Sequence, residues 1–366
     1  MPDRIRILLL ADTHLGFDLP AQPRVRRRRR GEDFLANYGR ALEPAHAGEV
    51  DLVVHGGDVF DRSRVPVSLA YQAMEPLARV ADRGVPVFIV PGNHERSLLP
   101  HGRFAAHPGV HVFDRPRAFV ADVRGVRVVL AGFPYERRDI RSRFTGVLGE
   151  TGWRSMGPGV RLLCVHHCVE GATVGPADFT FTTGDDVIRG RDVPPAFAAV
   201  LSGHIHRHQV LTTDLRGEPL ATPVLYPGSI ERTSFAEQDE AKGYLIVDVR
   251  CGDGDEERAE VGWDFRRLPA RPMIVRELDV SNDDASRLRS AVRLLVSGAP
   301  PDAVLRVHLN GPLTEAARRI LSSASLRSLA PPTMNVEVRE RTAPAGRQRR
   351  ARQATIPPAV LELPLL

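Results

Sequence analysis

The sequence predicts an α/β protein in which two mixed β-sheets pack together between flanking helices, with a small second module near the C-terminus. The first indication is a set of apolar runs that are continuous rather than alternating, which is typical of strands buried on both faces. These runs read IRILLLA, DLVVHGG, VPVFIVP and VRLLCV. The second indication is that helical patterns separate the first three runs, and the third is a series of later hairpin patterns.

Two helices are predicted between the first three strands. In the first helix, the apolar residues at helical spacing are Phe34, Leu35, Tyr38, Ala41, Leu42 and Ala45. In the second helix they are Leu69, Ala73, Leu77 and Val80. The second helix is expected to begin near Pro66 and to end at Gly84, where proline and glycine are favoured. Pro76 inside it predicts a kink, because proline removes a helical hydrogen bond.

Hairpin patterns follow, and they predict a second sheet. AFVADV and VRVVLAG flank the dipeptide Arg124-Gly125, and QVLTTD and PLATPVLYP flank another turn. Short turns of this kind join antiparallel neighbours. The segment KGYLIVDV adds a further strand. Together with the first strands and helices, these segments predict two packed sheets with helices outside them.

The segment RRLPARP interrupts the pattern around residues 268–272, and a small module of strands and helices follows it. Its order is strand IVRELDV, helix ASRLRSAVRLLVS, strand AVLRVHL, helix TEAARRILSSA and strand MNVEVRE. The module carries none of the chemical motifs below, so both a packing role and a role in substrate selection stay open. We therefore divide the chain into residues 1–268, 272–342 and a basic tail, 343–366, that ends in AVLELPLL.

The composition is that of a folded protein, because 366 residues with 42% hydrophobic content suffice for a large core and a smaller second domain. No apolar stretch approaches the roughly 20 residues that a membrane-spanning helix needs, and Met1 leads directly into a charged strand. We therefore expect a cytoplasmic protein that does not insert into membranes. An odd number of cysteines without metal-binding spacing predicts reduced thiols.

The net charge of +5 favours a polyanionic partner such as a nucleic acid. The strong preference for arginine over lysine offers a second explanation for this charge. Lys242 is the only lysine among the 50 basic residues, and such a preference for arginine is also what a biased genomic base composition produces. The most concentrated positive run is RVRRRRR at residues 24–30. We expect this run to form a loop that faces solvent or phosphate rather than to serve a structural role.

Short polar motifs stand at the ends of five apolar runs, where an α/β sheet gathers its reactive groups. They are Asp12-Thr-His14, Gly57-Asp58, Gly92-Asn93-His94, His166-His167 and Gly203-His204-Ile205-His206. Carboxylate, imidazole and amide oxygen without thiolate favour Mn²⁺, Fe²⁺ or Zn²⁺. A bridging carboxylate, for which Asp58 is the best candidate, can hold two ions about 3.5–4 Å apart for displacement at phosphorus.

In these motifs the chain resembles the calcineurin-like metallophosphoesterase superfamily, whose pattern DxH, GDxxD or GDxxH, GNH, H and GHxH is matched over residues 5 to about 250. The resemblance implies a four-layer αββα sandwich. It implies that one ion is held by Asp12, His14, Asp58 and His206, and the other by Asp58, Asn93, His166 and His204. Because a strand alternates faces, only one of His166 and His167 can ligate easily, and the family pattern favours His166. His94 matches a histidine that contacts the scissile phosphate and stabilises charge or protonates the leaving oxygen.

Within that superfamily the chain resembles the SbcD type and its Mre relatives, which are nuclease subunits of double-strand-break repair complexes. The resemblance rests on DTHLGF, GDVFDRSRVP, GNHER, GHIH and, above all, YPGSIERTSFAEQDEAKGY at residues 226–244. It implies a manganese-dependent 3′–5′ exonuclease on double-stranded DNA ends and an endonuclease on single strands, acting in DNA repair and recombination. It also implies a small α+β capping domain, for which residues 272–342 have the order and size, and an SbcC-like coiled-coil ATPase partner. Whether the chain also forms a homodimer stays open.

Two features depart from that pattern. Asp61 stands where archaeal and eukaryotic relatives often carry a second histidine and where the bacterial type commonly has aspartate, so we assign it to the catalytic set with His94. Relatives attach to the ATPase through helices that follow a linker, but only residues 343–366 remain here, which is short for a helical docking surface. AVLELPLL is the only candidate docking element.

Two alternatives to the nuclease stay open at this stage. One is a phosphodiesterase or phosphatase of the same superfamily that acts on small molecules or nucleotides, and the other is a DNA-end-binding scaffold with a structural metal centre. Individual residues also carry two interpretations. Phe179 is expected in the core but would otherwise stack on a base, and Arg96 and Arg232 either contact phosphates or are placed by chance.

Overall fold

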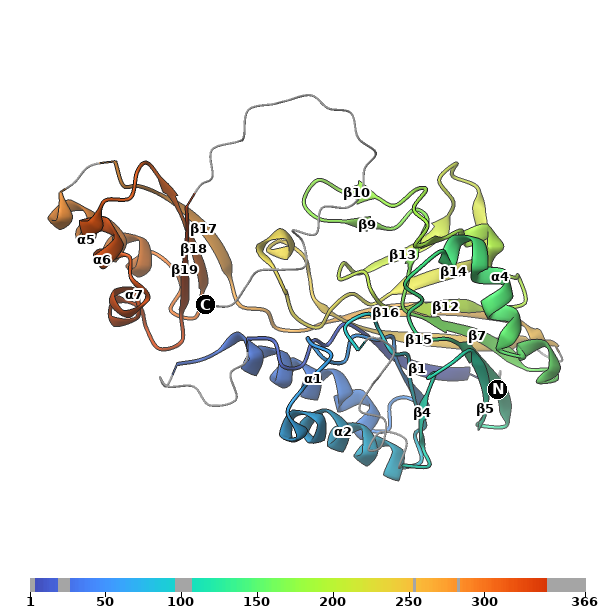
Figure 1. Cartoon of the computed structure of the whole chain (residues 1–366). Helices are drawn as coiled ribbons and strands as arrows, with labels where there is room; N and C mark the ends of the chain where they lie inside the picture. Colours follow the sequence, from blue (N-terminus) through green and yellow to red (C-terminus); the bar gives the residue numbers. More distant parts are fainter. Residues whose placement is uncertain (1–3, 19–26, 96–106, 253–254, 282–283, 341–366) are drawn as a thin grey trace.

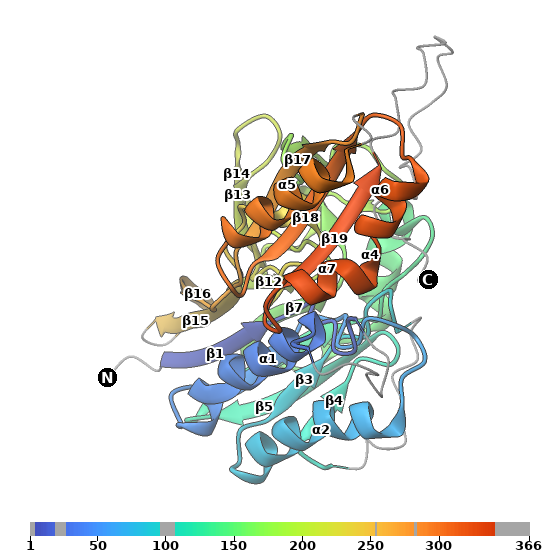
Figure 2. The same ribbon diagram turned by 90° about the vertical axis from the view of Figure 1, so that its left-hand side faces the viewer.

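Two six-stranded β-sheets lie face to face at the centre of the structure, with helices on their outer sides (Figure 1). The structure is a computed structural model that describes residues 4–18, 27–95, 107–252, 255–281 and 284–340. Figure 2 shows helices α1 (Arg30–His46) and α2 (Val67–Asp82) on the outer side of the first sheet. This layered arrangement confirms the predicted α/β fold class.

The first sheet has the order β16-β15-β1-β2-β3-β4. Its strands are β1 (Arg4–Leu10), β2 (Leu52–His55), β3 (Val87–Ile89), β4 (Val110–Val112), β15 (Gly243–Gly252) and β16 (Asp255–Arg267). The strands from β1 to β4 are parallel, whereas β15 runs antiparallel to β1 and β16 antiparallel to β15. The parallel strands therefore end at one edge of the sheet.

Strand β1 shows why the apolar runs are continuous. Leu8 and Leu10 pack toward α1 and α2, whereas Ile7 and Leu9 pack into the core between the two sheets. Because neighbouring side chains point to opposite faces and both faces are covered from Ile7 to Leu10, no position in this part of the strand favours a polar residue.

The second sheet has the order β13-β14-β12-β7-β6-β5. Its strands are β5 (Arg117–Val123), β6 (Val126–Gly132), β7 (Val160–Val165), β12 (Ala199–Ser202), β13 (Gln209–Thr213) and β14 (Pro219–Tyr226). Both predicted hairpins are present, and at the first turn Arg124 and Gly125 have φ of 50° and 82°, as a tight hairpin turn requires. Strands β6, β7, β12 and β14 run parallel.

Smaller elements complete the outer side of the second sheet. Helix α4 (Ile140–Glu150) packs against the outer face of this sheet, and the two share a hydrophobic core that is separate from the one between the sheets. The other elements there are the 3-10 helices η1 (Trp153–Ser155) and η2 (Gly190–Asp192) and the strands β8 (Cys168–Val169), β9 (Thr173–Val174), β10 (Phe179–Thr180) and β11 (Val187–Ile188). A third 3-10 helix, η3 (Phe235–Glu237), lies elsewhere, next to Arg306 of the C-terminal module. In the described part of the chain, no helix combines the length and apolar character that crossing a membrane requires.

The C-terminal module is a three-stranded parallel sheet with its helices on one face, the face turned away from the rest of the chain (Figure 1). Its elements are β17 (Met273–Asp279), α5 (Ala285–Ser297), β18 (Val304–Asn310), α6 (Glu315–Ile320), α7 (Ser323–Leu329) and β19 (Asn335–Glu340). The order of strands and helices is as predicted, except that the last helix is two. Ser322 divides them, because its hydroxyl caps the start of α7 by accepting from Ser325 N–H.

Arginines join this module to helix α1 and to the segment just before it. The buried Arg271 guanidinium bonds Asp33 Oδ2 at 3.0 Å and the Thr333 carbonyl at 2.6 Å. Arg27 donates to carbonyls at the end of α7, and Arg28 pairs with Asp33 at 2.5 Å. Residues 27–29 form a loop, as predicted, and Arg28 is exposed. The prediction that a structural role is lacking is wrong, because the guanidinium groups of residues 27–30 satisfy backbone and carboxylate acceptors. Residues 24–26 lie outside the described residues.

The two sheets are in backbone contact where Gly56 follows β2 and Gly203 follows β12. A Cβ atom on Gly203 would lie 2.5 Å from the Gly56 carbonyl oxygen and 2.9 Å from the Ala11 Cβ. A Cβ atom on Gly56 would lie 2.9 Å from the Gly203 nitrogen. Since these neighbours are backbone atoms of buried strand ends, only glycine fits at either position.

We predict that Gly203→Ala lowers the free energy of unfolding by about 1–3 kcal/mol or more, because the added methyl group overpacks this contact. The matched control is Gly39→Ala, inside α1, where an added Cβ meets nothing within 4 Å. That change should raise stability by about 0.5–1 kcal/mol, because alanine favours a helix over glycine. Urea unfolding followed by circular dichroism measures both, and equal stability of the two variants would contradict the prediction.

Candidate metal centre

The polar motifs that the sequence places at strand ends lie together at one edge of the two sheets. Asp12 and His14 follow β1, Asp58 follows β2, and Asn93 follows β3; these are neighbouring parallel strands of the first sheet. His166 follows β7, and His204 and His206 follow β12, which are neighbours in the second sheet. Because the sheets meet at Gly56 and Gly203, both contribute side chains to one cluster.

Four of the cluster residues have an unusual backbone. Asp12, His14, Asp58 and His204 have positive φ values of 50°, 40°, 50° and 85°, a region that residues other than glycine rarely adopt. Each such residue costs of order 1–3 kcal/mol, and strain of this kind concentrates at functional sites. Hydrogen bonds between the loops hold the conformation, with Asp12 N–H donating to the Gly57 carbonyl at 2.8 Å.

One half of the cluster gathers around two histidine nitrogens. His14 Nε2 lies 3.0 Å from His206 Nε2 and 4.0 Å from Asp58 Oδ2. His206 Nε2 in turn lies 3.9 Å from Asp12 Oδ1. Burial, reinforced by His206, lowers the pKa of His14 well below its usual value, so its imidazole is neutral and offers a lone pair.

The other half gathers around Asn93. Its Oδ1 atom lies 3.0 Å from His166 Nε2 and 2.8 Å from His204 Nδ1. His166 Nε2 is also 3.4 Å from Asp58 Oδ2, so Asp58 is in contact with both halves. Although burial opposes its charge, His166 holds the pKa of Asp58 well below the ordinary value, which keeps this carboxylate ionised.

These donors fit divalent metal ions. Ligands bound to one ion at about 2.0–2.2 Å lie roughly 3 Å from one another, which is close to the separations found here. Among the described residues, carboxylate and imidazole atoms within 4.8 Å of one another form three groups: Asp12, His14 and His206; Asp12, Asp58 and His166; and His14, Asp58 and His94. Oxygen and imidazole donors without thiolate suit borderline-hard ions. Cys164 and Cys168 are buried in hydrophobic clusters.

The two adjacent histidines, His166 and His167, point into different environments. His166 faces Asn93 and Asp58, whereas His167 Nε2 accepts a hydrogen bond from Glu136 N–H at 3.1 Å. The His167 ring packs beside Tyr135, with 4.9 Å between ring centroids. The two side chains point apart because consecutive residues leave an extended chain on opposite faces.

His94 lies at the open side of the cluster. Its Nδ1–H donates to the Asp61 carbonyl at 2.7 Å, and its Nε2 lies 3.9 Å from Asp58 Oδ2. The Asp61 carboxylate lies 3.7 Å from His14 Nδ1, so Asp61 touches two histidines of the cluster. Since His94 is within ligand distance of His14 and Asp58, its role as a residue that does not bind metal stays a prediction.

Some residues around the cluster were not assigned a role from the sequence. The buried Glu95 accepts from Phe60 N–H and Gly92 N–H, both at 2.8 Å, and so ties the loop after β2 to the loop after β3. Burial, reinforced by Asp58, raises the pKa of Glu95 to about 8. Glu237 Oε1 lies 3.2 Å from His206 Nδ1. Glu95 lies in the motif GNHER and Glu237 in the motif YPGSIERTSFAEQDEAKGY. Membership of these motifs was the sequence feature from which a role near the cluster could have been predicted.

The expectation that Phe179 lies in the core was wrong, and for Arg232 the sequence had left two interpretations open. Phe179 is 58% exposed on β10 with its ring against Phe181, so it is not a core residue. The Arg232 guanidinium donates to the carbonyls of Glu240 and Arg271, which leaves it a packing role. Arg96 lies outside the described residues.

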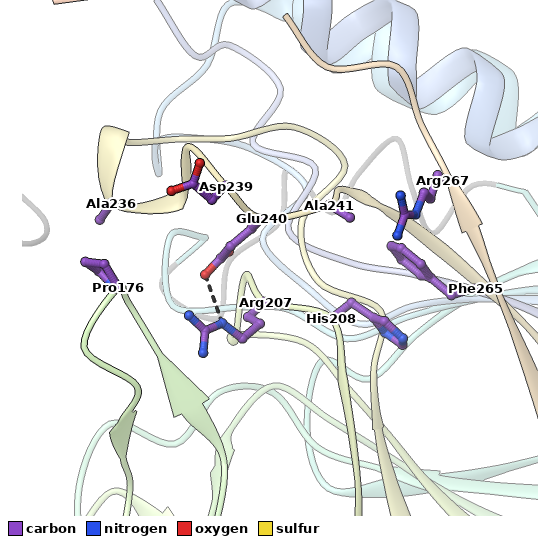
Figure 3. Close-up of a pocket in the computed structure, with 9 residues that line it drawn as sticks. All are labelled: Pro176, Arg207, His208, Ala236, Asp239, Glu240, Ala241, Phe265 and Arg267. Atoms are coloured by element: carbon purple, nitrogen blue, oxygen red, sulfur yellow. Dashed lines mark hydrogen bonds and ion pairs between the residues drawn. The ribbon is translucent and has the colours of Figure 1, made fainter. Parts of the chain in front are cut away.

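A pocket of about 460 Å³ lies beside the loop that follows the last cluster histidine (Figure 3). Its lining residues are Pro176, Arg207, His208, Ala236, Asp239, Glu240, Ala241, Phe265 and Arg267. Figure 3 shows Arg207 directed at Glu240, and the Nε–Oε1 distance is 3.0 Å. Other donors of Arg207 bond Gly175 and Asp178, so this guanidinium is engaged within the protein.

Residues 5–208 match the calcineurin-like phosphoesterase family. The DNA double-strand break repair protein Mre11 of Haloferax volcanii is 30% identical over 84% of this chain and 61% of its own length. The SbcD component of the SbcCD nuclease of Bacillus subtilis is 26% identical over 68% of this chain and 67% of its own length. The chain thus spans less than two thirds of the first of these relatives. Among solved structures, a dimetal phosphatase from Danio rerio aligns with 71% of this chain and 99% of its own, at 14% identity and a TM-score of 0.41.

We predict that Asp58→Asn reduces the number of bound divalent ions from two to at most one per chain. The reason is that Asp58 touches both halves of the cluster and the amide carries no charge. Metal analysis after dialysis against Mn²⁺ measures the number. Asp248→Asn, on β15 and paired with Arg4, is the matched control and should bind as many ions as the wild type. Retention of two ions in Asp58→Asn would contradict the prediction.

Proposed function

The chain belongs to the calcineurin-like phosphoesterase family, and we propose that it is a two-metal DNA nuclease of the Mre11 and SbcD type. The observation that carries the proposal is the pair of donor sets that share Asp58. Such a pair suits in-line displacement at phosphorus, which a single structural metal does not need. The relatives named as a repair protein and a nuclease support DNA as the substrate.

In the proposed site, one ion is held by Asp12, His14, Asp58 and His206. The other is held by Asp58, Asn93, His166 and His204. The short distances within each set support this division. When bound, two divalent ions, which we propose to be Mn²⁺ rather than Fe²⁺ or Zn²⁺, supply charge stabilisation at the phosphate and lower the pKa of water.

His94 and Asp61 complete the proposed catalytic set. The hydrogen bond from His94 Nδ1 to the Asp61 carbonyl orients the ring, so that Nε2 is directed toward the cluster. From there His94 stabilises negative charge on the scissile phosphodiester or gives a proton to the leaving oxygen. Asp61 acts by positioning: its carbonyl holds His94, and its carboxylate faces His14.

We assign catalysis to residues 1–268 and selection of DNA to the module at 272–342. On β18 of the module, Arg306 pairs with Glu337 and lies over the Phe235 ring, so the module is in contact with the segment that leads to the cluster. The proposed activities are 3′–5′ exonuclease action on double-stranded ends and endonuclease action on single strands, in cytoplasmic DNA repair and recombination. An SbcC-like coiled-coil ATPase and a second copy of the chain are the proposed partners.

We predict that the wild type degrades end-labelled duplex DNA in the presence of Mn²⁺ and that Asp58→Ala and His94→Ala both lose this activity. Loss of a proton donor typically costs about 10²–10⁴-fold in rate. Only Asp58→Ala should lose metal as well. The matched control is His107→Ala, whose ring pairs with Asp82 away from the cluster and which should cleave normally.

The same experiment decides between the alternatives when a chromogenic phosphodiester is tested in parallel. Turnover of the small ester without DNA degradation in any divalent metal would contradict the nuclease and support a small-molecule or nucleotide phosphodiesterase. Metal binding without turnover of either substrate would instead support a DNA-end-binding scaffold with a structural metal centre.

Residues 343–366 lie outside the described residues, and the predicted docking role of AVLELPLL is tested by deletion. We predict that removing residues 343–366 abolishes co-purification with an ATPase subunit encoded nearby, while Mn²⁺-dependent cleavage persists. Unchanged co-purification would show that the tail is not the docking element.

A further inference from the structure

Lys242 occupies an unusual place for a lysine. It is the only lysine among 50 basic residues, and its side chain is fully buried. A chain that otherwise uses arginine throughout thus keeps one ammonium group inside the protein. Lysine is almost never fully buried unless its charge is paired, so its surroundings need a specific explanation.

The surroundings match the shape of an ammonium group. Lys242 Nζ lies 2.6 Å from Glu237 Oε2 and 3.0 Å from Glu240 Oε2, and it donates to the His206 carbonyl at 2.9 Å. An ammonium group has three hydrogens, and each finds an acceptor here. The planar guanidinium of arginine carries five donors, so several would be left without a partner in this buried space.

Glu237 connects this lysine to the proposed metal centre. Its Oε1 atom accepts from His206 Nδ1 at 3.2 Å, and its Oε2 atom accepts from Thr233 N–H at 3.2 Å as well as from Lys242. His206 is thus held from two sides, at its ring by Glu237 and at its backbone carbonyl by Lys242. The other ring nitrogen, Nε2, is the atom that faces His14 and Asp12.

The contacts form a closed chain of charges. Glu240 accepts from Lys242 Nζ through Oε2. Its other oxygen, Oε1, accepts from Arg207 Nε (Figure 3). Arg207 follows His206 directly in the sequence, so the chain returns to the loop from which it started. These hydrogen bonds and ion pairs hold the loop after β12, which carries His206 and Arg207, against residues 237–242.

We propose that Lys242 and Glu237 are positioning residues that hold His206 in the orientation needed to bind one of the two metal ions. The inference rests on the proposed ligand set of Asp12, His14, Asp58 and His206. A carboxylate that accepts the second N–H of a metal-binding histidine fixes its tautomer and raises its basicity, and its loss typically weakens metal binding by about 10–100-fold. Because Lys242 and Glu237 contact His206 and none of the donors around Asn93, only one ion should be affected.

The test is an Mn²⁺ titration of the full, metal-free chain, followed by electron paramagnetic resonance, with Lys242→Arg and Glu237→Gln. The wild type should bind two ions and give the spectrum of a coupled pair. In both variants one ion should keep its affinity and the other should weaken by about 10–100-fold. The spectrum should therefore be that of a single ion at low Mn²⁺, and the coupled pair should return at high Mn²⁺.

Two further variants separate positioning from folding. Asp33→Asn breaks the buried pair with Arg271, which contacts neither His206 nor Glu237, and should lower stability without changing either affinity. Thr233→Val removes a hydroxyl that donates to Glu237 and lies 3.2 Å from His206 Nδ1, so it should weaken binding of the same ion by a smaller factor. This variant takes the place of Lys242→Arg if Lys242→Arg does not fold. Wild-type affinities in folded variants, or equal weakening of both ions, would overturn the proposal. Failure of the wild type to bind two ions would instead overturn the proposed metal centre.

Discussion

The close approach of two glycines is the constraint on which the rest of the structure depends. Gly56 and Gly203 let the end of β2 meet the end of β12, so that the carboxyl edges of both sheets open on the same space. A single sheet edge would bring together Asp12, Asp58 and Asn93 but no histidine of the second sheet. The polar cluster therefore exists because the two sheets are in backbone contact at this point.

The cluster destabilises the folded state, and buried hydrogen bonds and ion pairs around it compensate for this loss of stability. Several of its residues hold a left-handed backbone, and the carboxylates of Asp12 and Asp58 and the imidazoles of His14 and His166 are buried. Glu95 ties two of the strand-end loops together, and Glu237 with Lys242 ties down a third. A rigid arrangement of this kind keeps donor atoms at fixed separations before any ligand arrives.

The C-terminal module is joined to the same region. The Arg306 guanidinium lies 3.9 Å from the ring centroid of Phe235, and Phe235 shares the short helix η3 with Glu237. Arg271 anchors the base of the module to Asp33 of α1. The segment that orients His206 is therefore in contact with both parts of the chain, which gives residues 226–244 a structural role that metal binding alone would not require.

The sequence by itself determined the layered fold and the identity of the clustered residues, because continuous apolar runs and the polar residues that end them are local patterns. It missed β16, whose charged residues hide the alternation of Ala259, Val261 and Phe265 toward the core. Only the tertiary structure decided how the basic residues are used: Arg27 and Arg232 bond carbonyls, and Lys242 meets acceptors on two separate loops. The physical reason is that hydrogen-bond partners distant in the chain leave no periodicity in the sequence.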